Sequence, residues 1–316
     1  MKTLRFLLCT VALWLAPTVP AVEPEPKNEN APSVVFIGNS FTFGFGSPVQ
    51  FYRAQSVTDL NHEGKGGVPA LFKMFTNEAG RNFRVCLETV GGTNFDYHVQ
   101  KKAAVIGQPW DYVVTQGYSL LDKKNPGDPT MLVSSAKELA DLLRSKNPNV
   151  DIRLVSTWSR ADQTYTKKGH WHDQSIEKMA LDIRAAYDLA AAAGAPSIRG
   201  VIPVGEAWNR AFHAGVADPN PYDGISAGQI NLWTHDHYHA SAFGYYLEAL
   251  MIFGDMTGLD PRSLGKNERA AFELGFSPDQ ATALQQIAYD ELTATKDRPT
   301  LQSFQPIIPK SSPSDE

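Results

Sequence analysis

The sequence predicts an α/β fold, a three-layer α/β/α sandwich in which helices cover both faces of a central, mostly parallel sheet of five strands. Short apolar runs alternate along the chain with longer segments whose apolar residues recur every three or four positions, which is typical of parallel strands joined by helices. The chain has 316 residues, of which 42% are apolar, and this is enough for one sizeable core. We find no internal repeat and no second core that would predict another domain.

Each expected strand is a short apolar run bounded by turn-forming or polar residues. The five runs are Val34–Ile37, Phe83–Glu88, Tyr112–Thr115, Ile152–Ser156 and Gly200–Val204. The clearest helical patterns cover Val68–Phe75, Leu132–Arg144, Ile176–Ala193, Phe243–Phe253 and Asp279–Thr293. In an open parallel sheet, ligands bind beyond the carboxyl ends of the strands, so the residues that follow these runs are the first candidates for a site.

Two short motifs supply the residue types of a serine hydrolase. The first strand ends in Gly38-Asn39-Ser40, and Asp236-His237-Tyr238-His239 stands just before an expected helix. A serine hydroxyl becomes a useful nucleophile only when an imidazole takes its proton, and a carboxylate fixes the imidazole tautomer. The sequence therefore predicts Ser40 as nucleophile, His239 as general base and Asp236 as the orienting carboxylate.

These motifs resemble those of the SGNH/GDSL hydrolase superfamily, whose first block is Gly-Asp-Ser and whose last is Asp-x-x-His. The resemblance spans roughly residues 33 to 256. It implies a flavodoxin-like sandwich, an esterase that acts on a carboxylic ester, and no cofactor or metal. It also implies that backbone N–H groups of Ser40 and of a second-block glycine, Gly91 or Gly92, hold the oxyanion.

The third block departs from the usual Gly-x-Asn-Asp of the family, because Gln116-Gly117 follows the third strand. A Gln-Gly pair at this place resembles a branch of carbohydrate acetylesterases, in which the glutamine amide replaces asparagine as oxyanion donor. The resemblance thus implies Gln116 as the third donor and an O-acetyl group on a carbohydrate as substrate. Asn39, Trp158 and Trp233 are the expected substrate contacts, because aromatic faces suit sugar rings.

Two other functions remain open at this point. His235, His237 and His239 alternate and would share one face of an extended segment, which predicts a zinc-dependent hydrolase that needs no serine. The altered third block also allows a glycan-binding protein that keeps the fold but has lost turnover. Residues 44–67 form a long connection after Ser40, and both a lid or substrate wall and a plain surface insertion are open for it.

The start of the chain has the features of a secretory signal peptide. Basic residues precede the apolar stretch 6–15, and Val19-Pro20-Ala21 has the small residues of a cleavage site. We expect cleavage after Ala21 and a secreted or periplasmic protein without a membrane span, since about ten apolar residues are fewer than the ~20 that a span needs. A flexible lead-in over 22–32, one hydrolase-like domain over 33–298 and a disordered tail over 299–316 would follow.

Charge and cysteine content exclude several classes. The chain has 29 basic and 34 acidic residues, so it lacks the basic excess of a nucleic-acid-binding domain. The expected partner is a small-molecule or saccharide ester, and the sequence does not predict an oligomeric state. After signal cleavage only Cys86 remains, which rules out an intramolecular disulfide in the mature chain.

Overall fold

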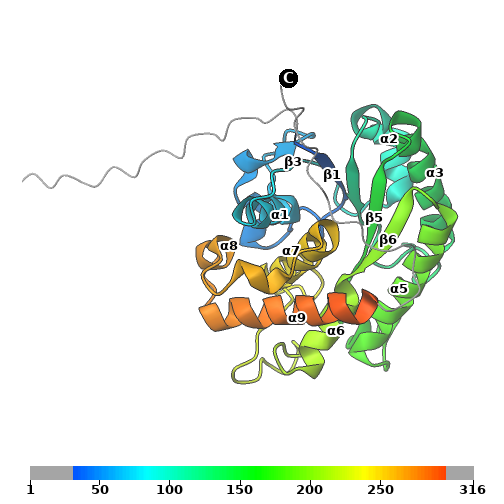
Figure 1. The fold of residues 1–316 in the computed structure, drawn as a ribbon. Coiled ribbons are helices and arrows are strands. Elements are labelled where there is room, and N and C mark those ends of the chain that lie inside the picture. The colour runs from blue at the N-terminus through cyan, green and yellow to red at the C-terminus, as the bar shows by residue number, and fades with distance from the viewer. Residues whose placement is uncertain (1–30, 297–316) are drawn as a thin grey trace, which may run out of the picture.

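The computed structural model describes residues 31–296, which form a three-layer α/β/α sandwich (Figure 1). The strands are β1 (Ser33–Gly38), β2 (Thr58–Asp59), β3 (Arg84–Thr89), β4 (Tyr112–Thr115), β5 (Asp151–Ser156) and β6 (Ile198–Pro203). The helices are α1 (Gly67–Glu78), α2 (Phe95–Ile106), α3 (Thr130–Lys146), α4 (Ala161–Thr164), α5 (Ile176–Ala193), α6 (Val204–His213), α7 (Ala242–Thr257), α8 (Arg269–Glu273) and α9 (Pro278–Lys296). The sandwich implied by the resemblance to SGNH/GDSL hydrolases is confirmed.

The sheet has six strands rather than the expected five. Their order is β2-β3-β1-β4-β5-β6, and every neighbouring pair is parallel. The extra strand, β2, lies at the edge and pairs Thr58 with Cys86 of β3. This strand has only two residues and pairs with a neighbour along one edge. Its sequence therefore carries no recognisable strand pattern.

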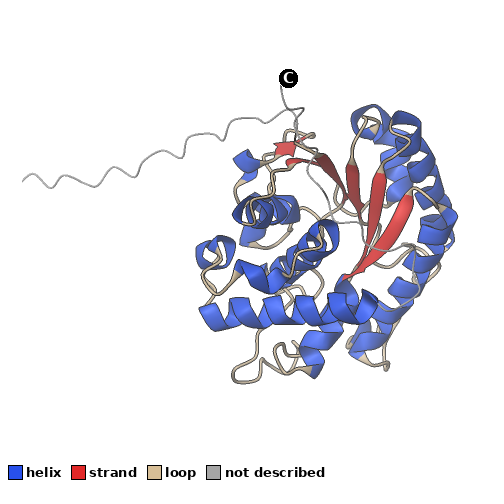
Figure 2. Ribbon diagram, viewed as in Figure 1, coloured by secondary structure: helices blue, strands red, loops and turns tan. Residues whose placement is uncertain are grey.

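Helices cover both faces of the sheet and enclose two separate cores. On one face α1, α6, α7 and α9 pack against β1, β3 and the ends of β5 and β6, and on the other α2, α3 and α5 pack against the same sheet. Figure 2 shows the red strands between these two blue layers. Each of the five helical patterns in the sequence forms a helix. Four of these helices extend one to four residues beyond the expected bounds at both ends, and α5 matches its expected bounds.

Residues 44–67 are part of the fold rather than a loose insertion. They form two short 3-10 helices, Pro48–Phe51 and Ala54–Ser56, and then β2. The Tyr52 hydroxyl donates to Glu273 of α8 at 2.7 Å, and the Arg53 guanidinium pairs with the same carboxylate. This segment therefore ties the start of the domain to its end.

Several expectations lie outside the described residues. They are the signal peptide over 1–21, most of the lead-in over 22–32, and the tail over 299–316. Within residues 31–296, no helix has both the length and the apolar content to cross a bilayer. Cys86 is a buried free thiol in β3, and burial raises its pKa, as expected for a packing residue rather than a nucleophile.

Phe75 joins α1 to α7 and offers a test of this core. Its side chain is fully buried, and its ring lies 5.2 Å from that of Tyr246 and 6.1 Å from that of Phe253. We expect Phe75→Ala to lower the free energy of unfolding by about 3–5 kcal/mol, because it leaves a cavity between the helices. Phe272→Ala, at a position 79% exposed, is the matched control and should change it by less than about 0.5 kcal/mol in urea unfolding. Equal effects of the two substitutions would contradict this packing.

Candidate active site

The turn after β1 presents Ser40 at the carboxyl edge of the sheet. A side chain at Gly38 would place its Cβ 2.2 Å from Oγ1 of Thr42, so only glycine fits where the chain folds back on itself. The Asn39 side chain closes the turn by accepting from the Phe41 N–H at 3.1 Å. The exposed fraction of Ser40 is 7%, so its hydroxyl lies in a largely water-excluded position.

The structure brings the three expected residues into one hydrogen-bonded chain. The Ser40 Oγ lies 3.0 Å from Nε2 of His239, and Nδ1 of the same ring lies 2.6 Å from Oδ2 of Asp236. Ser40 and His239 are 199 positions apart, so the tertiary fold alone creates this contact. The order and the distances are those needed for an imidazole to take a proton from the serine while a carboxylate holds its tautomer.

The carboxylate of Asp236 is held by its own loop. Its Oδ1 accepts hydrogen bonds from the Thr234 hydroxyl at 2.7 Å and from the backbone N–H groups of Tyr238 and His239 at 3.0 and 2.9 Å. Burial alone would raise the pKa of Asp236, but the bonds from His239, Thr234 and the backbone outweigh it and lower the pKa to about 2. Asp236 is therefore ionised at neutral pH, as the orienting role requires.

The ring of His239 is packed between aromatic side chains. Its centroid lies 3.9 Å from that of Tyr238 and 4.7 Å from that of Phe45, and 6% of the residue is exposed. Burial lowers the pKa of His239 below its usual 6.5 and outweighs the opposing effect of Asp236. The ring is thus neutral near pH 7 and can accept a proton.

Free backbone donors lie on the loop that follows β3. Gly92 has a φ of +68°, a conformation that strongly favours glycine. No acceptor within residues 31–296 pairs with the backbone N–H groups of Ser40, Gly91 or Gly92. Donors that are left unpaired beside a nucleophile are what the stabilisation of an oxyanion needs.

Gln116 lies at the end of β4 and is 2% exposed. Its Oε1 accepts from the Thr42 hydroxyl at 3.3 Å, and its Nε2 donates to the carbonyl of Gly117. One N–H bond of the amide therefore remains available, because a primary amide has two. The Gly117 carbonyl fixes which end of the amide is the donor, because a carbonyl can only accept.

Asn39, Trp158 and Trp233 were expected to contact the substrate, but their side chains contact other parts of the protein. Both N–H bonds of the Asn39 amide are used, by the carbonyls of Thr93 and Gly117 at 3.0 Å each. Trp158 and Trp233 are 0% and 1% exposed, and Trp158 stacks on Phe41 with centroids 4.2 Å apart. The expectation that these tryptophans line an open pocket is wrong, because Trp158 is buried against the turn that carries Ser40 and Trp233 is buried against Phe212, with ring centroids 5.4 Å apart.

The segment from Thr234 to His239 is not extended, as the predicted zinc site would require. The segment turns back on itself, with the Thr234 N–H donating to the His239 carbonyl at 2.8 Å. His237 adopts a φ of +55°, and its ring contacts that of Tyr222 at an angle of 48°, while His235 is exposed. Within residues 31–296, no three His, Cys, Asp or Glu side chains converge as metal ligands. The three imidazoles do not share a face.

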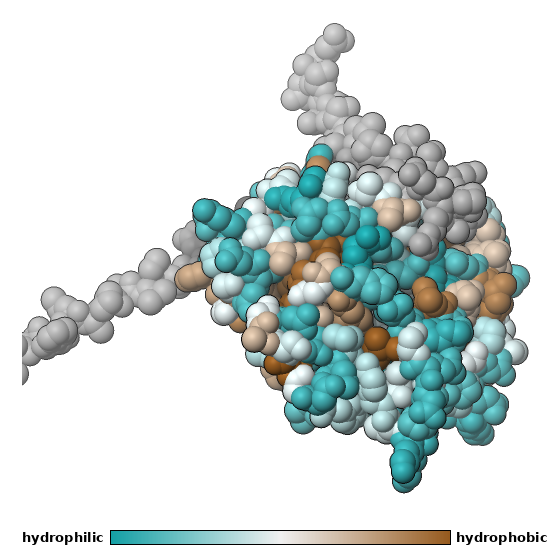
Figure 3. All heavy atoms as spheres, turned by 90° about the horizontal axis from the view of Figure 1, so that it is seen from below, coloured by the Kyte–Doolittle hydropathy of each residue, from teal (hydrophilic) through white to brown (hydrophobic). Residues whose placement is uncertain are grey.

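Phe45 is a site residue that the sequence reasoning missed. It is 46% exposed, and its ring contacts that of His239, so residues 44–67 begin as a wall beside the proposed base. Figure 3 shows apolar residues gathered in a recess with a hydrophilic surround on the face seen from below, where α6 follows the carboxyl end of β6. The signal in the sequence was an aromatic residue between Gly44 and Gly46, in the turn that follows Ser40.

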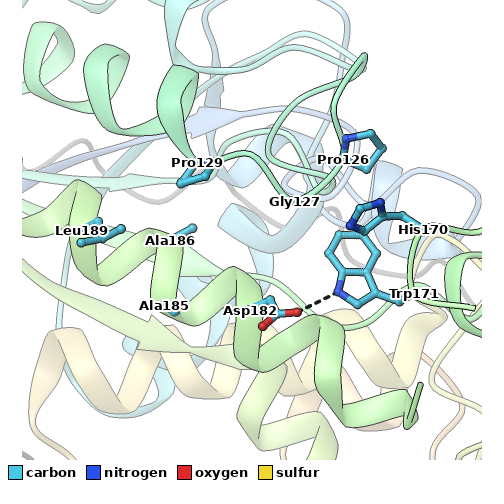
Figure 4. Close-up of a pocket in the computed structure, with 9 residues that line it drawn as sticks. All are labelled: Pro126, Gly127, Pro129, His170, Trp171, Asp182, Ala185, Ala186 and Leu189. Atoms are coloured by element: carbon cyan, nitrogen blue, oxygen red, sulfur yellow. Dashed lines mark hydrogen bonds between the residues drawn. The ribbon is translucent and has the colours of Figure 1, made fainter. Parts of the chain in front are cut away.

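A pocket of about 430 Å³ lies elsewhere, between α5 and the loop before α3 (Figure 4). It is lined by Pro126, Gly127, Pro129, His170, Trp171, Asp182, Ala185, Ala186 and Leu189. The Trp171 indole donates to Asp182 at 2.9 Å on its wall. None of the expected site residues contributes to this pocket.

Comparisons with known proteins give structural likenesses only. No family model matches the chain, and no curated protein matches it. It is similar to a DUF4886 family protein from Bacteroides uniformis, with 19% identity, a TM-score of 0.57, and coverage of 83% of this chain and 95% of that one. This likeness shows a shared fold.

Two further solved structures are more distant. One is a putative GDSL-like lipase from Parabacteroides merdae, at 14% identity, 70% and 93% coverage of the two chains and a TM-score of 0.47. The other is an alpha/beta hydrolase enzyme from the metagenome of Lake Arreo, Spain, at 15% identity, 71% and 95% coverage and a TM-score of 0.48.

The pKa of His239 provides a test of the site that does not depend on activity. We expect the ring nitrogens of His239 to titrate below 6.5 in an NMR titration of ¹⁵N-histidine-labelled protein. In Asp236→Asn the midpoint should fall further, because the carboxylate that favours the charged ring is gone. The exposed His213 serves as the internal reference in the same spectra. A His239 midpoint above 6.5 would contradict the buried, neutral ring.

Proposed function

We propose that this chain is an exported serine esterase of the SGNH/GDSL type, which hydrolyses a carboxylic ester by acyl transfer. The observation that carries this proposal is the hydrogen-bonded chain from Ser40 through His239 to Asp236, with distances of 3.0 and 2.6 Å. The signal-like start of the chain supports export.

In the first half of the reaction, Ser40 Oγ attacks the carbonyl carbon of the ester while its proton passes to Nε2 of His239. The resulting imidazolium is stabilised by the ionised Asp236 and then protonates the leaving alcohol. Because the resting ring is neutral, it can accept this proton at neutral pH.

The developing negative charge falls on the carbonyl oxygen. The unpaired N–H groups of Ser40 and of Gly91 or Gly92 support an oxyanion site there, and the remaining N–H of Gln116 can complete it. A water molecule activated by His239 then attacks the acyl-serine and releases the acid, which restores Ser40.

An O-acetyl group on a carbohydrate is the substrate class that we favour. Two exposed aromatic rings support it: Phe45, beside His239, and Tyr222, whose ring lies 4.3 Å from that of His237 and which is 45% exposed. Aromatic faces of this kind can stack on sugar rings. In this proposal the acyl group lies beside Ser40, and the alcohol part extends over these rings.

The decisive experiment measures p-nitrophenyl acetate hydrolysis by the mature protein with and without a chelator. Ser40→Ala and His239→Ala should each lower kcat by about 10⁶-fold, because neither half of the nucleophile and base pair works alone. Ser145→Ala, on the exposed face of α3, is the matched control and should retain the full rate. A fluorophosphonate should label wild type but not Ser40→Ala.

Other outcomes would point to other functions. Full activity in Ser40→Ala, together with loss in the chelator, would replace the serine mechanism with a metal-dependent one. Saturable glycan binding without turnover or labelling would indicate a binding protein on the same fold.

Gln116 gives a separate prediction about the oxyanion site. We expect Gln116→Ala to lower kcat by about 100- to 1,000-fold with a small change in KM, because the amide acts on charge that develops only in the transition state. Gln108→Ala, on the exposed loop before β4, is the control. If Gln116→Ala kept the wild-type kcat, the amide would not be an oxyanion donor.

A further inference from the structure

A second histidine–carboxylate pair lies under the loop that bears the free glycine donors. Glu88 at the end of β3 and His98 in α2 are both 0% exposed, and Nδ1 of His98 lies 2.5 Å from Oε2 of Glu88. Nε2 of the same ring lies 3.0 Å from Oγ1 of Thr93. Neither residue has a role in the proposed acyl transfer, so the presence of a completely buried pair needs another explanation.

The hydrogen bonds of Thr93 settle which nitrogen of His98 carries a proton. The Thr93 hydroxyl donates its one hydrogen to the carbonyl of Val90 at 2.7 Å, since a carbonyl can only accept. Towards His98 the same oxygen must therefore accept. Nε2 of His98 is the donor in that contact and bears a hydrogen.

Glu88 is the partner of the other ring nitrogen of His98, Nδ1. Its Oε1 accepts from the Asn61 amide at 3.1 Å and lies 3.7 Å from the ammonium of Lys102. Burial opposes ionisation of Glu88, but the bond to His98 and these neighbours outweigh it and lower the pKa of Glu88. Oε2 of Glu88 faces Nδ1 of His98, so the carboxylate holds the ring in the orientation that points Nε2 at Thr93.

Thr93 connects this pair to the proposed nucleophile turn. Its hydroxyl accepts from His98 and donates to the carbonyl of Val90. Its own carbonyl accepts from the Asn39 amide at 3.0 Å. The other end of the loop is held by the Val90 N–H, which donates to Gly38 at 3.0 Å. Only Gly91 and Gly92 lie between these anchors, and neither of their N–H groups has an acceptor within residues 31–296.

We propose that the Glu88–His98 pair is a positioning device for the oxyanion site: His98, held by Glu88, donates to the Thr93 hydroxyl and thereby aims the N–H groups of Gly91 and Gly92. The inference rests on the proposed esterase function. A completely buried polar pair whose hydrogen bonds are all made fixes the geometry around it, which is the property that an oxyanion site needs.

The hydrogen bond from His98 to Thr93 is tested by ¹⁵N NMR of histidine-labelled wild-type protein, with His98→Asn used for assignment. We expect Nε2 of His98 to carry a hydrogen, because the Thr93 hydroxyl can only accept in this contact. His213 faces a carboxylate, Glu177, at 2.7 Å on the exposed surface and serves as the comparison pair. A His98 ring without a hydrogen on Nε2 would overturn the proposal.

The positioning role is tested by two variants that leave Glu88 in place. Thr93→Val keeps the shape of the side chain but removes its hydroxyl, and His98→Asn keeps a donor near Nδ1 but offers nothing to Thr93. Each should lower kcat by about 10- to 100-fold with KM nearly unchanged, because the glycine donors are displaced rather than removed. His213→Gln, which removes the imidazole of the exposed pair, should keep wild-type kinetics.

A second readout separates failure of this inference from failure of the proposed function. The backbone amide signals of Gly91 and Gly92 should shift in Thr93→Val and in His98→Asn but not in His213→Gln. If wild type hydrolysed esters while Thr93→Val kept its kcat and its glycine signals, the positioning role would be wrong. If wild type hydrolysed no ester, the esterase proposal would fail, and the glycine signals with the His98 ring shifts would still decide whether the pair holds this loop.

Discussion

The side-chain amide of Asn39 is the constraint on which the site depends. Its two N–H bonds reach Thr93 after β3 and Gly117 after β4, while its oxygen accepts from the backbone next to Ser40. One planar group thus joins the ends of three neighbouring strands. Because β1 lies between β3 and β4 in the sheet, only a residue at this turn can reach both loops. The loops that supply the candidate oxyanion donors therefore take their positions from the turn that supplies the nucleophile.

Aromatic packing positions the His239 loop relative to the Ser40 turn. Phe41, one residue after the nucleophile, stacks on Trp158, and Trp158 stacks in turn on Trp208 at 4.7 Å with an interplanar angle of 4°. The Trp158 indole also donates to the carbonyl of Tyr238 at 3.2 Å, beside His239. A rigid ring that touches both the Ser40 turn and the His239 loop sets their separation, and it does so from a position without solvent exposure.

The sequence predicted the elements whose signals are local. The five longer strands, the main helices and the approach of Ser40, Asp236 and His239 follow from apolar periodicity and from motifs at strand ends and helix starts. Long-range features had no such signal. The strand β2 exists only because β3 offers it an edge, and the burial of Trp158 depends on helices far away in the chain. From sequence alone, a polar residue beside a nucleophile, such as Asn39, is equally consistent with a substrate contact and with a residue that holds neighbouring loops in place. The structure distinguishes the two.

The two histidine–carboxylate pairs illustrate how a third group decides what such a pair does. His239 and His98 each meet a carboxylate at Nδ1 and a hydroxyl at Nε2. The Ser40 hydroxyl has no other acceptor within residues 31–296, so its hydrogen is available to His239 and the ring can remain a neutral base. The Thr93 hydroxyl has already given its hydrogen to a carbonyl, so Nε2 of His98 must donate to it. A histidine and a carboxylate therefore serve proton transfer in one place and fixed geometry in the other. The difference comes from the Val90 carbonyl, which takes the hydrogen of the Thr93 hydroxyl.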